Sequence, residues 1–538
     1  MPQEDEVTQP RLLVGFLIVL PIISGCAPQP ALKEADASSA RGEWPSYNRS
    51  PSSQRFSPLK EINVGNAGRL REICTFDLGE QTMFESGPIM VNGIMYVTST
   101  ANTYAFDPST CKLVWKNHSE LDSSNAGLGN NRGAAYADGK IFRGLNAGYL
   151  IALDAKTGKL LWKTKASDGA IGESLPAAPV VWNGLVYLGN AGGDNAGVRG
   201  RLMAFDANDG HLVWSFDLVP MSGPGSETWP PSDPKVPRSG GATWSSYTID
   251  EARGLILAGT GNAAPDFDRD KRPGKNLYTN SIVILDAKTG KYHSSYQVTP
   301  NDFHDWDAAT APVLLTTAQG KELVLEAGKD GLLHAIDLKT MKELYATVVT
   351  TRENVDVPIS TTGTHFCPGT TGSSVWNGPS YSPDLNLVFV NSVDLCTTMR
   401  LNPDETEVVI GRPYSGAIPS EPFGKPDPES EWKGWVTAVD ADSGVVRWRH
   451  QMKAPVPGAI TSTAGGLVFS GDTTGNFLAF SAADGKVLFQ TTVSEPIGGG
   501  IVSYLMHQKQ FVAVAAGLYS PHNWGAHGTS GKVIVFGL

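Results

Sequence analysis

Short runs of alternating apolar and polar residues recur along this chain in one arrangement. An apolar run leads into Asp, a small residue (usually Gly) follows four residues later, and Trp follows four residues after that. The clearest copies are TYAFDPSTCKLVW ending at Trp115, LIALDAKTGKLLW at Trp162, LMAFDANDGHLVW at Trp214 and VTAVDADSGVVRW at Trp448. Alternation on both sides of a tight polar turn predicts two antiparallel strands, so each copy is a predicted β-hairpin.

The spacing of the copies predicts the architecture. Weaker copies surround Asp286, Asp337 and Ser481, and successive Asp positions are 47, 52, 80, 51, 103 and 41 residues apart. Hairpin units that recur every 40–50 residues or so are typical of β-propellers. The longest interval has room for another unit, and residues 375–395 carry strand–turn–strand signals there. We therefore expect an all-β, eight-bladed β-propeller over residues 43–538, with an N-terminal strand completing the last blade.

Composition agrees with this architecture and excludes one class of partner. The 538 residues include 59 Gly and 36 Pro, and 18% are charged, as expected of a chain with many hairpin turns. The net charge of −11 argues against nucleic-acid binding, which needs a basic surface. No apolar run reaches the length of a transmembrane helix.

The N-terminus predicts export. Residues 12–23 are apolar and suit the core of a signal peptide, which we place at residues 1–25. The run ends in Ile-Ser-Gly-Cys, which resembles a bacterial lipoprotein cleavage box with Cys26 as the lipidated residue; the alternative is an ordinary signal peptide with a chance Cys. The acidic start at residues 4–6 departs from the usual basic one. Residues 26–42 are a predicted flexible tether, so we expect a periplasmic protein attached to a membrane only through lipid on Cys26.

Four further cysteines predict two disulfide bonds. An even number in an exported protein favours pairing, and the pairs expected here are Cys74–Cys111 and Cys367–Cys396. Two strands of one blade could bring Cys74 and Cys111 together. The alternative is free buried thiols. The sequence contains no Cys-x-x-Cys-His motif, so no haem c is expected to be attached to this chain.

The repeats and the segments between them resemble the quinoprotein alcohol dehydrogenases. The resemblance covers residues 43–538 and is most specific in the motifs GGATW, GTGNAAP and DFHDWD. It implies that pyrroloquinoline quinone (PQQ) binds on the axis of an eight-bladed propeller. It also implies that Trp244 stacks under the cofactor, Asn262 ligates a metal ion, and Asp305 is the catalytic base.

Quinone-dependent alcohol oxidation requires these residue types whether or not the family resemblance is considered. A planar quinone needs a flat aromatic platform, and a hard cation prefers oxygen ligands. A carboxylate within hydrogen-bond reach can take the hydroxyl proton as hydride leaves the alcohol carbon. In related lanthanide-dependent enzymes, the position of Asp307 holds an extra metal ligand. Strand alternation would place Asp305 and Asp307 on one face; the alternative for Asp307 is a carboxylate outside the metal shell.

Other positions match the family pattern less specifically. The resemblance implies polar contacts to the cofactor from Glu85, Arg132 and Ser174, and it places Lys329 beside the quinone oxygens. An Arg suits carboxylates through paired hydrogen bonds, and a nearby cation stabilises the reduced, anionic cofactor.

The chain also departs from the family pattern. The usual Glu metal ligand is replaced by Asn195, with Asp194 beside it, and either residue could supply oxygen. The vicinal Cys pair that covers one cofactor face in the family is absent, with Ala126 and Gly127 in the matching stretch. Pro457 replaces a Trp, and Val375 replaces a cofactor-contacting Asn. These differences predict a divergent subgroup with an altered pocket.

Two classes of function compete. The first is a periplasmic dehydrogenase that uses PQQ with Ca²⁺ or a lanthanide ion, oxidises an alcohol, and passes electrons to a separate cytochrome c; a sugar or polymer alcohol is an alternative substrate. The second is a non-enzymatic propeller lipoprotein that acts as a scaffold. The DFHDWD motif favours the enzyme, because a scaffold has no need of carboxylates on its axis. We expect the loops at residues 217–240 and 402–434 to determine specificity.

Overall fold

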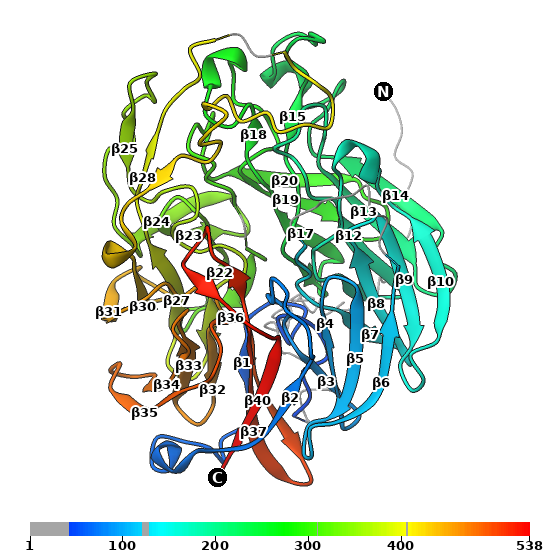
Figure 1. Ribbon diagram of the computed structural model, residues 1–538, viewed down its shortest axis with the longest axis vertical. Coiled ribbons are helices and arrows are strands. Elements are labelled where there is room, and N and C mark those ends of the chain that lie inside the picture. The colour runs from blue at the N-terminus through cyan, green and yellow to red at the C-terminus, as the bar shows by residue number, and fades with distance from the viewer. Residues whose placement is uncertain (1–41, 121–128, 309, 405–406) are drawn as a thin grey trace, which may run out of the picture. The chain divides into compact units, whose positions relative to one another are not determined.

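The computed structural model describes residues 42–120, 129–308, 310–404 and 407–538 (Figure 1). The predicted signal peptide, Cys26, nearly all of the tether, and Ala126 and Gly127 lie outside these residues. Within the described ranges, no helix has the length and apolar character needed to cross a membrane. The 3₁₀ turns there are η2 (Ala67–Arg69), η3 (Gly169–Ile171), η4 (Ser226–Thr228), η5 (Arg269–Lys271) and η6 (Glu429–Glu431).

The regular structure of the described chain consists almost entirely of antiparallel sheets. Seven sheets contain four strands, and one contains five because β1 (Phe56–Ser57) adds in parallel to β32. The first sheets along the chain comprise β3 (Ile89–Val91), β4 (Ile94–Thr98), β5 (Asn102–Asp107) and β6 (Lys112–His118); β7 (Ala135–Ala137), β8 (Lys140–Leu145), β9 (Tyr149–Asp154) and β10 (Leu160–Lys165); β11 (Val180–Trp182), β12 (Leu185–Gly189), β13 (Arg201–Asp206) and β14 (Leu212–Asp217); and β16 (Tyr247–Asp250), β17 (Leu255–Gly259), β19 (Ser281–Asp286) and β20 (Tyr292–Gln297).

The later sheets repeat this order. They comprise β21 (Val313–Thr316), β22 (Glu322–Ala327), β23 (Leu332–Asp337) and β24 (Lys342–Val348); β26 (Ser380–Ser382), β27 (Leu387–Asp394), β30 (Lys433–Asp440) and β31 (Val446–Met452); β32 (Thr461–Thr463), β33 (Leu467–Gly471), β34 (Asn476–Ser481) and β35 (Val487–Thr492); and β36 (Ile497–Met506), β37 (Lys509–Ala516), β40 (Lys532–Gly537) and β2 (Arg71–Asp77). Smaller sheets are formed by β15 (Ser239–Gly240) with β18 (Ala263–Ala264), β25 (Thr364–Phe366) with β28 (Thr397–Met399) and β29 (Lys425–Pro426), and β38 (Tyr519–Ser520) with β39 (Ala526–His527).

Each copy of the repeated motif is the hairpin between the third and fourth strands of a sheet, as predicted. The Asp closes the turn: Asp154 Oδ1 accepts hydrogen bonds from the backbone N–H of Thr157 at 2.8 Å and from its hydroxyl at 2.7 Å. The same carboxylate–hydroxyl contact joins Asp286 to Thr289 at 2.6 Å. The Asp is therefore a local turn residue.

The Trp of the motif joins neighbouring sheets. Trp214 Nε1 donates to the carbonyl of Ala287 at 2.9 Å, and Ala287 directly follows the Asp of the next copy. The Gly of that copy, Gly290, lies so close that a Cβ there would be 2.6 Å from the indole ring. Trp115 donates to Ala155 in the same way, at 3.0 Å. The motif therefore encodes both a turn and the packing of one sheet on the next.

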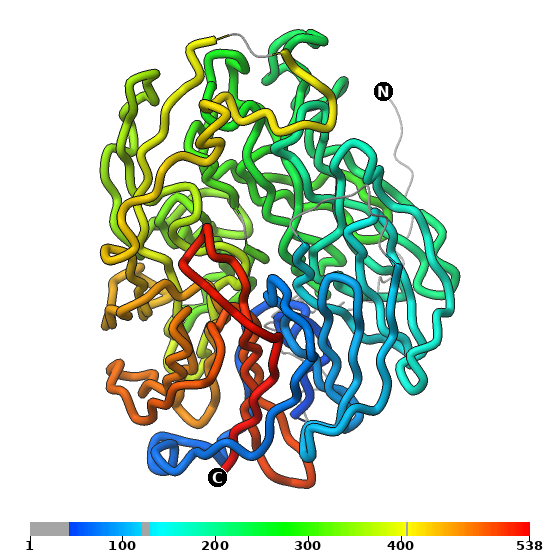
Figure 2. Tube along the Cα trace, viewed as in Figure 1, coloured from blue at the N-terminus to red at the C-terminus, as the bar shows by residue number. Residues whose placement is uncertain are grey.

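The last sheet combines both ends of the described chain. N-terminal β2 pairs with C-terminal β40, and Figure 2 shows these blue and red segments side by side. A Cys74–Cys111 disulfide links β2 to the turn after β5, and a Cys367–Cys396 disulfide is also present. The expected N-terminal strand and both expected disulfides are confirmed, but Cys74 and Cys111 belong to different sheets and not to two strands of one blade.

Residues 45–55 hold the first strands of several sheets together. Backbone carbonyls of this segment accept N–H groups from the beginning of different sheets: Pro51 from Ile249, Ser52 from Leu314, and Gln54 from Tyr381. Neighbouring first strands also contact one another, as with β3 and β7, β7 and β11, and β11 and β16. The first strands therefore lie innermost, around this segment.

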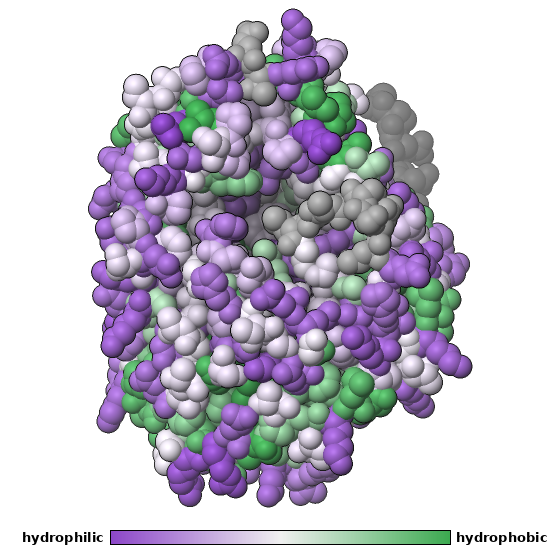
Figure 3. Space-filling view, in the orientation of Figure 1, coloured by the Kyte–Doolittle hydropathy of each residue, from purple (hydrophilic) through white to green (hydrophobic). Residues whose placement is uncertain are grey.

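The outer strands carry most of the solvent-facing apolar residues. In Figure 3, polar side chains cover most of the visible face, and apolar ones gather in separate patches. Leu113 and Leu160, on the fourth strands β6 and β10, are about half exposed, at 53% and 52%. The buried apolar side chains instead form clusters between adjacent sheets, as where Val324 of β22 packs with Leu257 of β17.

Candidate active site

The predicted site residues lie in two kinds of loop that share one end of the sheets. One kind precedes the first, innermost strand of a sheet; the other joins its second strand to its third. Because neighbouring strands are antiparallel, the start of the first strand, the end of the second and the start of the third fall at the same edge. Loops of the first kind carry Glu85, Arg132, Ser174, Trp244, Asp305 and Asp307, and loops of the second kind carry Asp194, Asn195, Asn262 and Lys329.

Arg132 connects three of these loops. Its Nη1 donates to the carbonyl of Trp244 at 2.7 Å, and its Nη2 lies 2.8 Å from Glu85 Oε2. The guanidinium carbon lies 4.6 Å from the centre of the Trp244 ring. Asn130 also donates to Glu85, at 3.0 Å. The buried Nε of Arg132 has no hydrogen-bond partner within the described residues, so one donor remains for a ligand beside the indole.

Lys329 brings two predicted carboxylates together. Its Nζ lies 3.2 Å from Asp305 Oδ2 and 2.9 Å from Asp307 Oδ2. The same nitrogen lies 5.7 Å from the centre of the Trp244 ring. Asp305 and Asp307 are buried, with 5% and 4% of their surfaces exposed. The ammonium, both carboxylates and the indole therefore form one cluster.

Strand alternation does not explain why the two carboxylates meet. Residues 302–308 are irregular, and Asp305 has a φ of 64°, in the left-handed region. We expected both residues to lie on one face of a strand, and this was wrong because the segment forms no strand. Lys329, in the loop after β22, and the backbone N–H of Asn262 instead hold the two side chains together. The Asn262 backbone N–H donates to Asp307 Oδ1 at 2.6 Å.

The side-chain amide of Asn262 is held by its neighbours. Its Nδ2 donates to Asp266 Oδ1 at 2.9 Å and to the carbonyl of Ala263 at 3.3 Å. With the amide hydrogens used in this way, the amide oxygen is left to accept or to ligate. This arrangement suits the predicted role of Asn262 as a metal ligand.

Of the two candidates for the missing Glu ligand, Asp194 is the one whose charge interacts with the cluster. Burial and the nearby charge of Asp307 together raise the pKa of Asp194 to about 6, while Lys329 opposes this shift. Asn195 is directed elsewhere, since its Nδ2 is 3.5 Å from the carbonyl of Gly172. Asp194 is therefore the better placed oxygen donor.

The cluster holds more negative than positive charge. Burial raises the pKa of Asp305 well above its ordinary value, and Lys329 opposes this shift while Asp307 and Asp194 reinforce it. Burial alone would lower the pKa of Lys329, but Asp305 and Asp307 outweigh this effect and raise it. A buried surplus of carboxylates around one ammonium fits a bound cation, and the donors are the hard oxygens that Ca²⁺ and lanthanide ions prefer.

The flat platform and the unused donor also fit PQQ. Trp244 is only half-buried, whereas its neighbours Thr243 and Ser245 are buried. A partly exposed indole beside Arg132 and Lys329 suits a planar group that carries carboxylates. Ser174 lies beside the segment that carries Asp194, because its backbone pairs with Ala191.

Sequence reasoning missed three residues of this region. Trp376, which is fully buried, places its ring 5.5 Å from the Arg132 guanidinium and packs edge-on against Trp524 at 5.2 Å. Asp266 lies beside Asn262. The available signals were a Trp next to the noted Val375 and an Asp immediately after the GTGNAAP motif.

Both predicted specificity loops support this region. In the 402–434 loop, Tyr414 N–H donates to the carbonyl of Asp194 at 2.8 Å, and the carbonyl of Ser415 accepts from Phe267 at 2.9 Å. The 217–240 loop ends in β15, whose pairing with β18 lies next to Asn262. The loops therefore contact the segments that carry the carboxylates.

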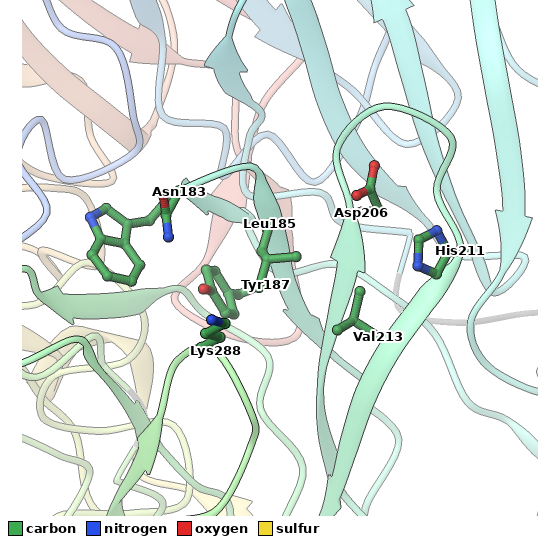
Figure 4. Close-up of a pocket in the computed structure, with 8 residues that line it drawn as sticks. Asn183, Leu185, Tyr187, Asp206, His211, Val213 and Lys288 are labelled. Carbon is green, nitrogen blue, oxygen red and sulfur yellow. The ribbon is translucent and has the colours of Figure 1, made fainter.

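A separate surface pocket shares no residue with the site. Figure 4 shows its lining, which includes Tyr187, Asp206, His211 and Lys288. Asp206 and His211 lie close enough to Asp209 to suggest a metal site. However, Asp206 already caps its turn by accepting from Asn208 N–H at 2.7 Å, and His211 Nδ1 is 2.7 Å from Asp209. These local contacts account for the cluster.

The fold and the site define a β-propeller oxidoreductase of the quinoprotein class. Residues 44–351 match the family described as "Glucose/ethanol/alcohol dehydrogenase, beta-propeller domain", and residues 432–520 match "Outer membrane protein assembly factor BamB". The chain belongs to the PQQ-dependent alcohol dehydrogenase family. The predicted family, the enzyme class and the cofactor class are confirmed.

Individual relatives agree. The chain is 30% identical to the dehydrogenase subunit of the alcohol dehydrogenase (quinone) of Gluconacetobacter polyoxogenes, over 98% of this chain and 81% of the relative. It is 31% identical to the lanthanide-dependent methanol dehydrogenase of Methylacidiphilum fumariolicum (strain SolV), over 89% of this chain and 85% of the relative. A solved structure of a europium-containing methanol dehydrogenase superposes with a TM-score of 0.82 at 28% identity, covering 92% of this chain and 98% of that one.

Proposed function

We propose that this protein oxidises an alcohol to an aldehyde or ketone, with Asp305 as the base and a metal ion held by Asn262, Asp305, Asp307 and Asp194. The observation that carries this proposal is the meeting of Asp305, Asp307 and Lys329 beside the half-exposed face of Trp244. A purely structural propeller gains no stability from such buried like charges.

The residues divide the chemistry among them. When bound, PQQ supplies the carbonyl that accepts the hydride. Asp305 takes the hydroxyl proton, so the alcohol loses one proton and one hydride and is oxidised by two electrons. Lys329 stabilises negative charge that develops near the platform. Arg132, positioned by Glu85 beside Trp244, would bind a carboxylate of the cofactor.

We further propose that the eight main sheets are eight blades, and that the protein works in the periplasm with lipid on Cys26. The apolar residues 12–23 and the small residues before Cys26 support export and lipidation. Disulfides persist in oxidising compartments, which also supports the location. The sequence lacks a Cys-x-x-Cys-His motif, so electrons pass to a separate cytochrome c.

The decisive experiment compares Asp305→Asn with Asp472→Asn. Asp472 is a buried carboxylate that binds Thr474 and Asn476 within its own turn, so it is a matched control. We expect Asp305→Asn to retain PQQ, followed by absorbance, while dye reduction with alcohols falls about 10²–10⁴-fold. Unchanged turnover would refute the assigned base.

A scaffold function has one observation in its favour, the match of residues 432–520 to an outer-membrane assembly factor. The same experiment separates the two functions. If the wild-type protein binds no PQQ with either Ca²⁺ or a light lanthanide, the scaffold is favoured. Sugars and polymer alcohols belong in the substrate panel, because the loops at 217–240 and 402–434 leave the substrate class open.

A further inference from the structure

Asp266 is a fully buried carboxylate beside the predicted metal ligand Asn262. Its exposed fraction is 0%, and its Oδ1 accepts the hydrogen bond from Asn262 Nδ2 at 2.9 Å. This bond determines which way the Asn262 amide faces, because an amide that donates toward Asp266 must present its oxygen on the opposite side. Asp266 therefore positions a ligand atom of the proposed cation site.

The second oxygen of Asp266 has no protein partner. Oδ2 is buried and makes no hydrogen bond within the described residues. The guanidinium of Arg272 lies nearby, but its nitrogens donate to the backbone carbonyls of Pro265, Asp266 and Asp302 and to the Asn276 side chain. A buried carboxylate oxygen left in this state is costly unless a cation lies nearby.

One residue links Asp266 to the carboxylates of the site. Asn262 donates from its side-chain amide to Asp266 and from its backbone N–H to Asp307. In their ionised forms, Asp194, Asp266, Asp305 and Asp307 carry four negative charges, and Lys329 carries one positive charge in contact with two of them. The balance of three negative charges equals the charge of a lanthanide ion and exceeds that of Ca²⁺.

We propose that Asp266 is a further anionic group of the cation site: it orients Asn262 and makes the site selective for a trivalent ion over a divalent one. The inference rests on the proposed function, because it presupposes that a cation binds among these carboxylates. Beyond that function, it assigns Asp266 to the cation site and attributes to it a preference for trivalent over divalent ions.

The expected size follows from Coulomb's law. At a given distance, a charge of the site interacts 1.5 times more strongly with a trivalent than with a divalent ion. Loss of a group that orients a metal ligand typically costs about 10–100-fold in affinity. If neutralising Asp266 weakens Ca²⁺ binding about tenfold, it therefore weakens lanthanide binding about 30-fold, and the preference falls by about threefold.

The test measures metal binding and does not require turnover. Tb³⁺ is titrated into the PQQ-loaded protein and followed by luminescence sensitised through tryptophan, and Ca²⁺ affinity is obtained by competition. Asp266→Asn retains an oxygen that can accept from Asn262, so it removes charge alone. We expect this variant to lose affinity for both ions and to lose more for Tb³⁺, whereas Asp472→Asn keeps wild-type values.

The outcomes are distinguishable. An Asp266→Asn variant that matches Asp472→Asn, or that weakens both ions equally, overturns the inference and leaves the proposed function intact. The wild-type protein gives a second measurement that does not depend on the variant's folding: Ca²⁺ binding as tight as Tb³⁺ binding also overturns the inference. A wild-type protein that binds neither ion nor PQQ sinks the proposed function itself.

Discussion

Substitution of Gly290 by Ala tests the packing between sheets that the repeated motif encodes. Two effects oppose an added methyl group there. The backbone φ is 69°, a conformation that costs an L-residue about 1 kcal/mol. The new Cβ would also lie 2.6 Å from the Trp214 ring, which is buried and held by its bond to Ala287. Overpacking of this kind costs about 1–3 kcal/mol more.

Gly184→Ala is the matched control. Gly184 also lies in a hairpin turn, with a φ of 78°, but no atom lies within 4 Å of its would-be Cβ. We therefore expect a loss of about 1 kcal/mol in unfolding free energy for Gly184→Ala and about 2–4 kcal/mol for Gly290→Ala. Urea unfolding followed by tryptophan fluorescence would measure the difference.

A double substitution sharpens this test. In a Trp214→Ala background the ring is absent, so Gly290→Ala should lower the unfolding free energy only through its positive φ, by about 1 kcal/mol. Equal losses for Gly290→Ala and Gly184→Ala, or an unchanged cost of Gly290→Ala without the indole, would refute the idea that the Trp of one repeat packs on the Gly of the next.

Three further predictions concern the site and its surroundings. Arg132→Lys should weaken PQQ binding at least about tenfold, measured by absorbance titration, because one ammonium cannot bind Glu85 and the Trp244 carbonyl as the guanidinium does and still offer a donor to the cofactor; the surface change Arg253→Lys should have no such effect. Asp194→Asn should weaken Tb³⁺ binding about 10–100-fold while Asn195→Ala changes it little, and the reverse order would contradict the orientation described. Asp330 and Glu343 raise the pKa of His334 to about 10 against the effect of burial. Since this folded value exceeds the unfolded one, the contribution is complete below about pH 6.5 and is lost as pH rises through 10; urea midpoints should fall over this range more steeply in the wild type than in His334→Gln.

Sequence reasoning reached the hairpins, because their signals are local. The Asp of each copy bonds to residues two or three positions away, as Asp154 does with Thr157, so periodicity and turn chemistry suffice to locate it. The closing strand β2 followed from sheet closure, and two disulfides followed from the even number of cysteines, although Cys74 and Cys111 join different sheets. The backbone conformation around Asp305 could not be predicted in this way, since a left-handed residue in an irregular segment leaves no periodic signal in the sequence.

The sequence by itself determined the unit of the fold and the residue types of the site: strands, turns, a stacking Trp, an amide and a pair of carboxylates. The tertiary structure decided which of them meet. Asn262 N–H binds Asp307, and Arg132 binds both Glu85 and the carbonyl of Trp244. The reason is physical: these contacts join loops from different sheets, and the charge that such loops gather depends on how the sheets pack around residues 45–55.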